Sequence, residues 1–429
     1  MTHLLRSIAR RAEARVFCVA GSRFAENARL LRLSQGIRLA ATPRAANLLL
    51  IVGKLDTGLV APALVAHDAL SPPRATVWWR GEAQAPLVRA NFPDAIVIQG
   101  NDPVPALKRV HEELVMGERE GEQPLLPDVE PAPWQGIGPY GQGGKAMTGG
   151  VPYGRPMPER ADGRDGLKLD FLPVRVGPLF APFPVGLALD VKLQGDVIQE
   201  ATLENFAHAW ASERSIFHRA LRAPVAIHDL EVARARSHLQ WLSEAVGIAG
   251  AASLSERILR LAQRVEPEDG DEIRALERSL RRRGFLGWNT RGVGVIDPNM
   301  SQGITGPVAR ASGLPIDSRA DVDAYRRLAF EPLVQEGGDS AARWIQRLRE
   351  AAQAVELAAR AGDDRAGGEG VIESPRGALT SQEGPSHAIA RLVPSLLAGM
   401  EWGDAVTTIA SLDLDMAEAH TPSHTSAAS

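Results

Sequence analysis

The first 116 residues alternate between short apolar runs and segments with helical spacing. The apolar runs are continuous, and each ends near Gly, Asn or Pro: VFCVAG, IRLAA, NLLLIVG, ATVWWRG and AIVIQGN. Between them lie helix-like stretches such as GLVAPALVAHDAL and DPVPALKRVHEELV. Continuous apolar strands that alternate with helices are typical of a parallel sheet covered on both faces. We therefore predict a doubly wound α/β domain with a parallel sheet over residues 1–116.

Two segments at the ends of this domain have other patterns. Residues 2–15, THLLRSIARRAEAR, predict a short helix, which is either a solvated terminal helix or one that docks on a membrane surface or a partner. Residues 117–166 are dense in Gly, Pro and charge and have no sustained period. Such a composition predicts a linker or an extended wrapping segment.

From residue 167 onward the pattern changes to alternation and then to a helical period. LKLDFLPVRVGP and GLALDVKLQGDVIQEATL alternate like antiparallel strands. The longest helical candidates after them are PVAIHDLEVARARSHLQWLSEAVGI, SLSERILRLAQRV, DEIRALERSLRRR and GDSAARWIQRLREAAQAVELAARA. We predict a mainly helical α+β domain over residues 167–419 and a disordered polar tail over residues 420–429.

Composition excludes several classes of function. The chain of 429 residues has a formal net charge of −4, which gives no global signal for nucleic acid binding. No apolar run reaches the roughly 18–20 residues that span a bilayer. The single cysteine, Cys18, cannot hold an iron–sulfur cluster, which takes about four thiolates, or a cysteine-rich zinc site. We expect a cytoplasmic chain with no cluster ligands of its own.

Three motifs that point to nucleotides or metals are better explained otherwise. GIGPYG at 136–141 fits GxGxxG but does not lie between a strand and a helix, and GGKA at 143–146 lacks the Ser or Thr that would hold magnesium. The histidines at 208, 218, 228 and 238 recur every ten residues, which does not place them on one helix face. We interpret them as satisfied helical histidines.

The most distinctive stretch runs from Gly303 to Gln353. Its Gly, Pro, Arg, Asp and aromatic residues have the form GvtGPvlRaSG…DlR…Y…F, followed by GD…R…R..E..Q. The matching residues are Gly306, Pro307, Arg310, Ser312, Gly313, Asp317, Arg319, Tyr325, Phe330, Gly338, Asp339, Arg343, Arg347, Glu350 and Gln353. This stretch resembles the large quinone-site subunit of respiratory complex I and the large subunits of membrane-bound [NiFe] hydrogenases. We expect these residues to set turns, helix starts and salt bridges.

A second resemblance lies in the N-terminal domain. The stretch from VAGSRFAENARLL to VAHDAL is similar to the small, cluster-bearing subunit of complex I and of [NiFe] hydrogenases, in which daGSCNGCE carries cluster cysteines. Arg23 and Glu26 occupy the positions of those two cysteines. The resemblance therefore implies the fold of the small subunit without its cluster.

In the C-terminal domain, acidic residues likewise occupy positions that are cysteines in the family it resembles. SLDLDMAEAH at 411–420 resembles the second paired-cysteine motif of hydrogenase large subunits, with Asp415 and Glu418 at the cysteine positions. Two carboxylates alone fall short of the six or so ligands of a hard metal, so we expect a solvated pair near a helix end. ESPRGALTSQ at 373–382 resembles a segment near the buried cavity of the family, and Arg376 is expected to line that cavity or to pair with Glu373 in a buried ion pair.

The two resemblances together imply a fusion of a small-subunit-like and a large-subunit-like domain. Their implied function is a peripheral-arm subunit of a complex I-like or energy-converting hydrogenase-like membrane assembly. Its implied partners are antiporter-like membrane subunits and other complex I-like subunits, with peripheral attachment to the inner face of the cell membrane. The chain would act as a scaffold or coupling element without a metal centre, and whether it is itself an enzyme stays open.

Two alternatives to this scaffold remain open. The first is a quinone-binding subunit with NADH-quinone oxidoreductase function in a complex. It predicts a quinone-sized cavity between the domains that is lined by a tyrosine or histidine, with Tyr153 and Arg376 as candidate residues. Quinone is then the one candidate cofactor. The second alternative is a ligand-binding protein unrelated to membranes.

Overall fold

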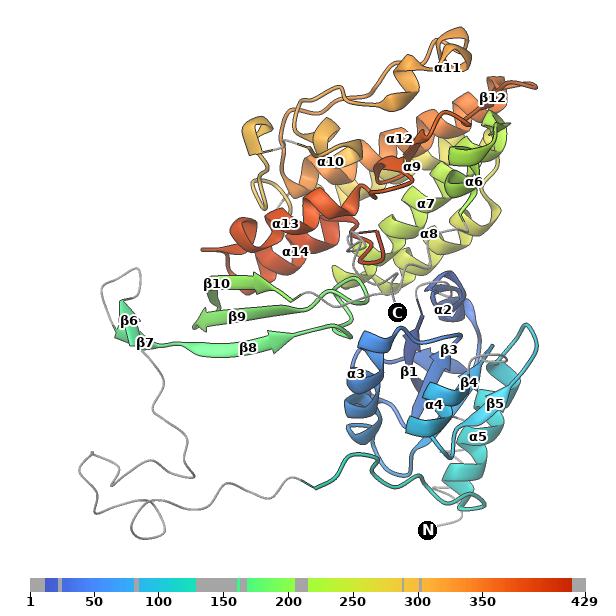
Figure 1. Cartoon of the computed structure of the whole chain (residues 1–429), viewed down its shortest axis with the longest axis vertical. Coiled ribbons are helices and arrows are strands. Elements are labelled where there is room, and N and C mark those ends of the chain that lie inside the picture. Colours follow the sequence, from blue (N-terminus) through green and yellow to red (C-terminus); the bar gives the residue numbers. More distant parts are fainter. Residues whose placement is uncertain are drawn as a thin grey trace, which may run out of the picture.

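The computed structural model describes residues 12–21, 25–80, 85–128, 160–162, 168–204, 215–287, 289–300 and 303–418. It contains a parallel sheet with its helices, which we call the sheet unit (described residues 12–128), and a larger, mainly helical part, which we call the helical unit (described residues 168–418). Figure 1 shows the helical unit above the sheet unit, with helix α2 at their contact. Within the described residues, no helix is long and apolar enough to cross a membrane.

The sheet unit is built on five parallel strands in the order β2-β1-β3-β4-β5. These strands are β1 (Ala14–Ala20), β2 (Ile37–Leu39), β3 (Leu48–Val52), β4 (Ala75–Trp79) and β5 (Ile96–Ile98). Every residue of β3 and β4 is buried, which explains why these runs are continuously apolar. The predicted parallel sheet is confirmed. The helix predicted over residues 2–15 is wrong for Ala14 and Arg15, because these two residues begin strand β1. Residues 1–11 lie outside the described residues.

Helices cover both faces of this sheet. They are α2 (Ala25–Leu30), α3 (Thr57–Asp68), α4 (Ala85–Asn91) and α5 (Val104–Met116). On one face, Leu107 and Val110 of α5 pack against the side of the sheet that carries Leu50. On the other face, Leu59 and Ala63 of α3 pack in a cluster with Leu49 and Ile51. Successive residues of a strand thus serve opposite cores, as the two-faced pattern requires.

The start of the predicted linker is fastened to the sheet unit. The Glu122 carboxylate accepts hydrogen bonds from the backbone N–H and the hydroxyl of Thr76, both at 2.7 Å, and lies 3.0 Å from Nε2 of His67. The other ring nitrogen of His67 lies 2.7 Å from Asp68. Buried polar contacts therefore hold the first part of the predicted linker or wrapping segment against the sheet unit. Residues 129–159 and 163–167 lie outside the described residues.

Two antiparallel sheets follow. The short strands β6 (Arg160–Asp162) and β7 (Lys168–Asp170) pair with each other, and β8 (Leu172–Val176), β9 (Leu189–Gln194) and β10 (Val197–Leu203) form a sheet in the order β10-β9-β8. The predicted antiparallel strands are confirmed. Leu189, Val191 and Ile198 face a core shared with the helix α13 (Ser386–Leu397), so this sheet belongs to the helical unit.

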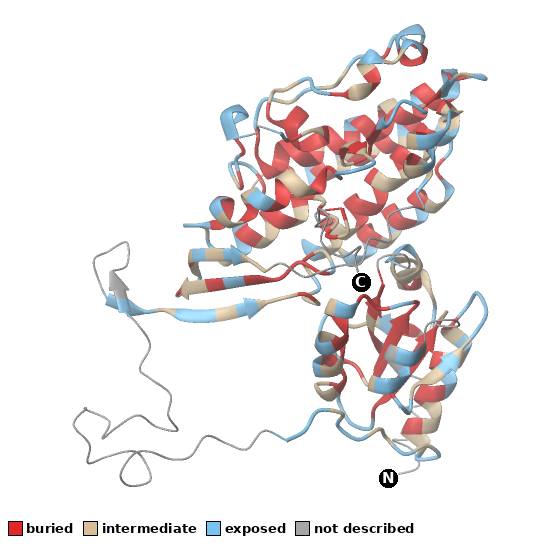
Figure 2. Cartoon of the chain, viewed as in Figure 1, coloured by how far each residue is buried: buried red, intermediate tan, exposed pale blue. Residues whose placement is uncertain are grey.

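The helical unit is organised around two long helices, α7 and α12. Its helices are α6 (Ile216–Arg222), α7 (Ile227–Ile248), α8 (Ala252–Arg264), α9 (Gly270–Arg282), α10 (Gly306–Ala311), α11 (Asp323–Arg327), α12 (Ser340–Arg360), α13 (Ser386–Leu397) and α14 (Trp402–Leu412). The predicted stripe of Trp344, Leu348, Ala351 and Val355 is buried in the core between α7, α8, α9 and α12. Figure 2 shows this burial along both long helices.

Short strands complete the helical unit. They are β11 (Val225–Ala226), β12 (Arg365–Ala366), β13 (Val371–Ser374) and β14 (Gly377–Thr380), of which β13 and β14 form a tight hairpin. Arg376 lies in the two-residue turn of that hairpin. Gly306 lies directly against this turn, with a backbone φ of +73°, and a Cβ there would overlap the carbonyl oxygen of Arg376. A glycine is therefore required at the start of α10 for the hairpin to approach.

Candidate functional site

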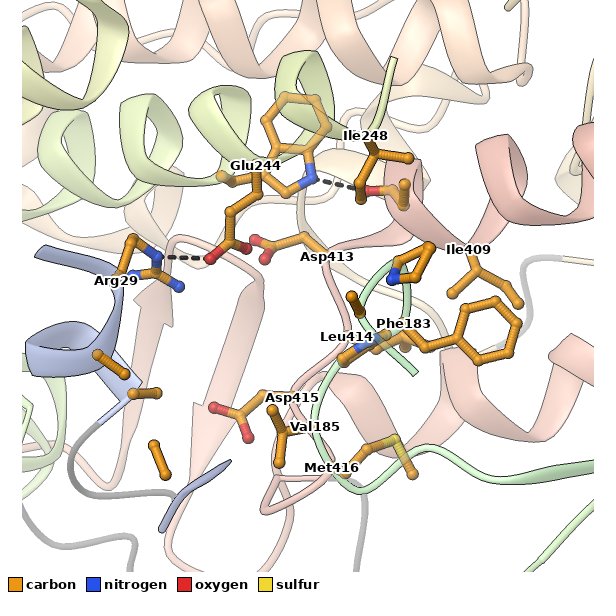
Figure 3. A pocket seen from close by; sticks show the side chains of 18 of the residues that line it. Arg29, Phe183, Val185, Glu244, Ile248, Ile409, Asp413, Leu414, Asp415 and Met416 are labelled. Atoms are coloured by element: carbon orange, nitrogen blue, oxygen red, sulfur yellow. Dashed lines mark hydrogen bonds and ion pairs between the residues drawn. The ribbon is translucent and has the colours of Figure 1, made fainter. Parts of the chain in front are cut away.

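A cavity of about 340 Å³ lies between the sheet unit and the helical unit. Its walls include β1 and α2 on one side, and α7, the loop 181–185 and the segment 409–417 on the other. Figure 3 shows Arg29, Glu244, Asp413 and Asp415 around the space, with apolar side chains such as Phe183 beside them. The volume lies in the range of small-molecule sites, which is roughly 300–1,000 Å³.

A set of hydrogen bonds crosses the boundary between the units at one wall of the cavity. Arg29 of α2 donates from Nε to Oε1 of Glu244 at 2.6 Å and from Nη1 to Oε1 of Gln240 at 3.1 Å. Gln240 in turn donates from Nε2 to Oε1 of Glu26 at 3.0 Å. Burial opposes ionisation of Glu244, but the Arg29 guanidinium outweighs it and lowers the pKa of that carboxyl. These contacts join α2 to α7.

Glu26 thus has a structural partner where the resemblance places a cluster cysteine. Its carboxylate contacts the helical unit through Gln240, and Arg23 lies outside the described residues. The thiol of Cys18 also lines the cavity, and burial raises its pKa to about 12. A protonated thiol is a poor metal ligand, because metals bind the thiolate. The described residues on this side of the cavity therefore do not fit an iron–sulfur cluster.

The opposite wall is built around Arg376. Its guanidinium lies 3.3 Å from Glu418, 3.6 Å from Asp415 and 3.6 Å from Asp413, and its Nε donates to the carbonyl oxygen of Asp413 at 3.0 Å. Asp413 is also 3.1 Å from Nη1 of Arg347, which lies on α12. Three carboxylates and two guanidinium groups therefore meet in one partly buried cluster, which we call the acid cluster (Arg347, Arg376, Asp413, Asp415 and Glu418).

This cluster corrects two sequence-based expectations. Asp415 and Glu418 are not a solvated pair, because Glu418 is buried and both contact Arg376. Arg376 lines the cavity, and it does not pair with Glu373. The Glu373 carboxylate instead accepts from Nη1 of Arg310 at 2.8 Å and from the Ser318 hydroxyl at 2.9 Å. The tertiary fold brings partners that are distant in sequence to both groups.

The acid cluster also bears on metal binding at this wall. Asp415 and Glu418 are hard oxygen donors, whereas paired cysteines supply soft thiolates, which suit other metals. Their shared neighbour is a permanently charged guanidinium, which would repel a metal cation. Among the residues that the structure describes, no group of three His, Cys, Asp or Glu is placed to hold a metal ion. The pair does not fit the nickel–iron centre of the hydrogenases that SLDLDMAEAH resembles.

Behind the cavity, the residues of the distinctive stretch form a buried charge network. Arg310 donates to Glu350 at 2.8 and 3.0 Å and lies 2.9 Å from Asp317. Arg319 pairs with Asp317 at 2.8 Å and with Glu231 at 3.1 Å. Asp339 caps the start of α12 by accepting from the backbone N–H of Ala342 at 2.7 Å. The expectation that this stretch sets turns, helix starts and salt bridges is confirmed.

The histidines do not assemble a site in the described chain. His238 is buried in α7 with Nε2 at 3.5 Å from Glu350, and burial lowers its pKa to about 4. His218 contacts the Ser215 hydroxyl at 2.7 Å, and His228 lies 3.3 Å from the carbonyl oxygen of Ala358. His238 is a buried packing residue, and neither of its ring nitrogens has a hydrogen-bond partner among the described residues, so it is not the satisfied histidine that we expected. His208 lies outside the described residues.

The cavity meets part of the expectation for a quinone site. Leu39, Leu59, Trp241, Ile409 and Met416 contribute apolar surface, as a quinone ring requires. No tyrosine or histidine is among the described residues that line it. Tyr153, the candidate from the sequence, lies outside the described residues. The described walls therefore fit an apolar ring. Their polar groups are the charged pair Arg29–Glu244 and three members of the acid cluster, Arg376, Asp413 and Asp415.

Several of these residues were missed by sequence reasoning. Arg29, Glu244 and Asp413 carry no motif of their own, and Arg29 and Glu244 are 215 positions apart. The available signal for Asp413 was its place two residues before Asp415 in SLDLDMAEAH. Arg29 and Glu244 could not be identified from the sequence, because only the folded structure shows that they contact each other across the unit boundary.

Part of the helical unit is similar to known respiratory-chain proteins. Residues 251–384 match the family described as "Respiratory-chain NADH dehydrogenase, 49 Kd subunit". One relative, an NADH-quinone oxidoreductase subunit from Clostridium beijerinckii, is 29% identical over 159 residues, which cover 29% of this chain and 43% of the relative. The resemblance predicted from the stretch Gly303–Gln353 is confirmed for this part of the chain.

Two more relatives are also named as NADH-quinone oxidoreductase subunits. The protein from Thermodesulfovibrio yellowstonii is 44% identical over 70 residues, covering 15% of this chain and 18% of the relative. The protein from Sinorhizobium medicae is 35% identical over 91 residues, covering 20% and 22%. The chain thus matches less than half of the length of these relatives.

A solved structure is also similar in part. It belongs to the membrane-bound sulfane sulfur reductase (MBS), an archaeal respiratory membrane complex. The two chains are 16% identical, with a TM-score of 0.40. The aligned part covers 58% of this chain and 98% of the chain in the solved structure. A likeness of this size carries no argument about function.

Proposed function

We propose that this chain is a peripheral-arm subunit of a complex I-like or energy-converting hydrogenase-like membrane assembly. In it the chain acts as a scaffold or coupling element. The division into a small-subunit-like domain (1–116), a linker (117–166) and a large-subunit-like domain (167–419) is part of the proposal. The partners would be antiporter-like membrane subunits and other complex I-like subunits, and the chain would lie on the cytoplasmic face of the membrane.

One observation carries the proposal: hydrogen-bonded and ion-paired side chains occupy the positions at which the resemblance places cysteine ligands. Glu26 bonds to Gln240, and Asp415 and Glu418 surround Arg376. Glu26 and Gln240 join the two units, whereas Arg376, Asp415 and Glu418 all lie in the helical unit, and this arrangement supports a mechanical role at the cavity. A covalent link between two units that contact each other also raises their effective concentration.

The test is affinity purification of the tagged full-length chain from native membranes, followed by identification of the partners. We expect membrane proteins of the antiporter-like class to co-purify with it. Arg29→Glu, which places two acids in contact at the unit boundary, should reduce their recovery. Arg264→Glu changes an exposed arginine within the helical unit and is the matched control. Recovery of the tagged chain without membrane partners would overturn the proposal.

Quinone binding is a second candidate function, which the apolar lining of the cavity favours. Ala28 lies on α2 and lines the cavity, so Ala28→Trp should fill it. A short-chain quinone is expected to quench tryptophan fluorescence in the wild-type chain and to lose affinity at least about tenfold in Ala28→Trp, a change of about 1.4 kcal/mol. Val65→Trp, at an exposed position of α3, is the control. Unchanged affinity in Ala28→Trp would exclude this cavity as the site.

A further inference from the structure

The acid cluster has an excess of negative charge. Asp413, Asp415 and Glu418 are three carboxylates, and Arg376 and Arg347 are the two guanidinium groups within ion-pair distance of them. A guanidinium stays charged at any ordinary pH. One negative charge is therefore left over when all three acids are ionised. A buried uncompensated charge is costly, and such a group neutralises itself by binding a proton.

The three acids differ in how well they tolerate that charge. The side chain of Asp415 is 36% exposed and faces the cavity, so water solvates it. Asp413 has Arg347 at 3.1 Å in addition to Arg376. Glu418 is 10% exposed, and its partners are Arg376 at 3.3 Å and the Ser386 hydroxyl at 3.1 Å. The excess charge is least stable on Glu418.

The charged groups of every neighbouring element support this order. Arg376 faces Glu418 from the β13–β14 turn, and Asp413 and Asp415 face it from its own segment. Farther out, Arg29 and Arg32 both act on Glu244 of α7, and none of these three groups is among the main influences on Glu418. Burial, the largest cause, raises the pKa of Glu418 to about 7, against the opposing effect of Arg376.

We propose that Glu418, which contacts the cavity-lining Arg376 from behind the wall of the interunit cavity, is a proton-exchanging group. It holds a proton near neutral pH, and Arg376 connects its protonation to the cavity wall. When Glu418 binds the proton, the guanidinium of Arg376 is left to Asp413 and Asp415. When the proton leaves for solvent, Arg376 is shared among all three acids. No electron is transferred, and this inference does not depend on the proposed function.

The hydroxyl of Ser386 donates a hydrogen bond to Glu418 and therefore offers a second way to change the pKa of Glu418. Its Oγ lies 3.1 Å from Oε2 of Glu418 and accepts from the backbone N–H of Asp415 at 3.0 Å. A hydroxyl that donates to a carboxylate favours the ionised form. Removing it should therefore make Glu418 hold its proton to higher pH, whereas an acid elsewhere in the chain would not respond.

The test is infrared spectroscopy of the full-length chain labelled with 13C-glutamate, recorded as a function of pH. The C=O stretch of a protonated carboxyl is separate from the carboxylate bands. We expect a labelled carboxyl band that disappears with a midpoint near pH 7, a loss of this component in Glu418→Gln, and its retention in Glu369→Gln at an exposed position. Ser386→Ala should move the midpoint upward.

Two results of this experiment would overturn the role of Glu418. A titrating component of equal intensity in Glu418→Gln belongs to another acid, such as the buried Glu373, and overturns it. The lack of any labelled carboxyl band near neutral pH overturns it as well. If Glu418→Gln does not fold, Ser386→Ala decides, because an unmoved midpoint contradicts a titrating Glu418.

Discussion

Nε of Arg29 lies 2.6 Å from Oε1 of Glu244, and this pair joins the sheet unit to the helical unit across 215 positions of sequence. The Glu244 side chain is 42% exposed, so solvent screens part of the attraction. We expect a double-mutant cycle with Arg29→Ala and Glu244→Ala to give a coupling of roughly 0.5–1 kcal/mol in the free energy of unfolding. Added salt should reduce it.

The matched control for this cycle is the pair Arg264–Glu272, which has the same 2.6 Å separation but lies within the helical unit. Its coupling should be similar in unfolding experiments, yet it should not affect how the two units hold together. Equal loss of partner recovery from membranes in both cycles would contradict a special role for Arg29 at the boundary.

Arg310 is the centre of the buried network and should be among the least tolerant positions. Its removal in Arg310→Ala leaves Glu350, Glu373 and Asp317 without their shared cation in a buried place. Breaking a buried pair in this way costs about 3–5 kcal/mol. Chemical unfolding should show that loss or a chain that does not fold. Arg326→Ala breaks exposed pairs and should cost less than about 1 kcal/mol.

Gly306 should reject any side chain. Its φ of +73° is unfavourable for other residues, and a Cβ would overlap the carbonyl oxygen of Arg376. Gly306→Ala should therefore destabilise the chain and displace the turn that holds Arg376. Gly313, with a φ of +93° and open space around it, isolates the backbone effect. Gly313→Ala should cost about 1–2 kcal/mol, and an equal cost at both positions would refute the close approach.

The buried ring of His238 should make the free energy of unfolding depend on pH in the acid range. Burial lowers its pKa from 6.5 to about 4, so the folded chain holds the neutral ring while the unfolded chain binds a proton first. Its contribution is present above about pH 6.5 and is lost as pH falls through about 4. The loss is on the order of 3 kcal/mol, and His238→Leu should remove it. Val246→Ala on the same helix should lower stability equally at all pH values.

The main elements could be predicted from the sequence because their patterns are local. The apolar runs of β3 and β4 are buried on both faces, and the stripe that contains Trp344 and Leu348 faces the helical core. Such patterns report how each segment is buried, whatever its partner. For Arg376 the resemblance of ESPRGALTSQ left two alternatives, a place on the cavity wall or a pair with Glu373, and did not decide between them.

The partners of the charged groups could not be predicted in the same way. Asp415 and Glu418 look like a solvated pair from their spacing, and Arg376 looks like the neighbour of Glu373. Both interpretations fail because Arg310 takes Glu373 from 63 positions away, and Arg376 meets the segment after α14 instead. Which acid neutralises which arginine is decided by packing between distant segments. The contacts at the start of the predicted linker could not be predicted for the same reason, since His67 and Glu122 meet only in the folded unit.

We propose that charged side chains which pair with one another lie at this cavity, at the positions where the resemblance places redox centres. The most direct test of this claim is metal analysis of the full-length chain, purified after expression with ample iron and nickel, with a hydrogenase of known content as standard. We predict far less than one iron or nickel per chain, because Asp415 and Glu418 are held by Arg376 and Cys18 is a protonated thiol. One nickel per chain, or the roughly four irons of a cluster, would contradict the claim.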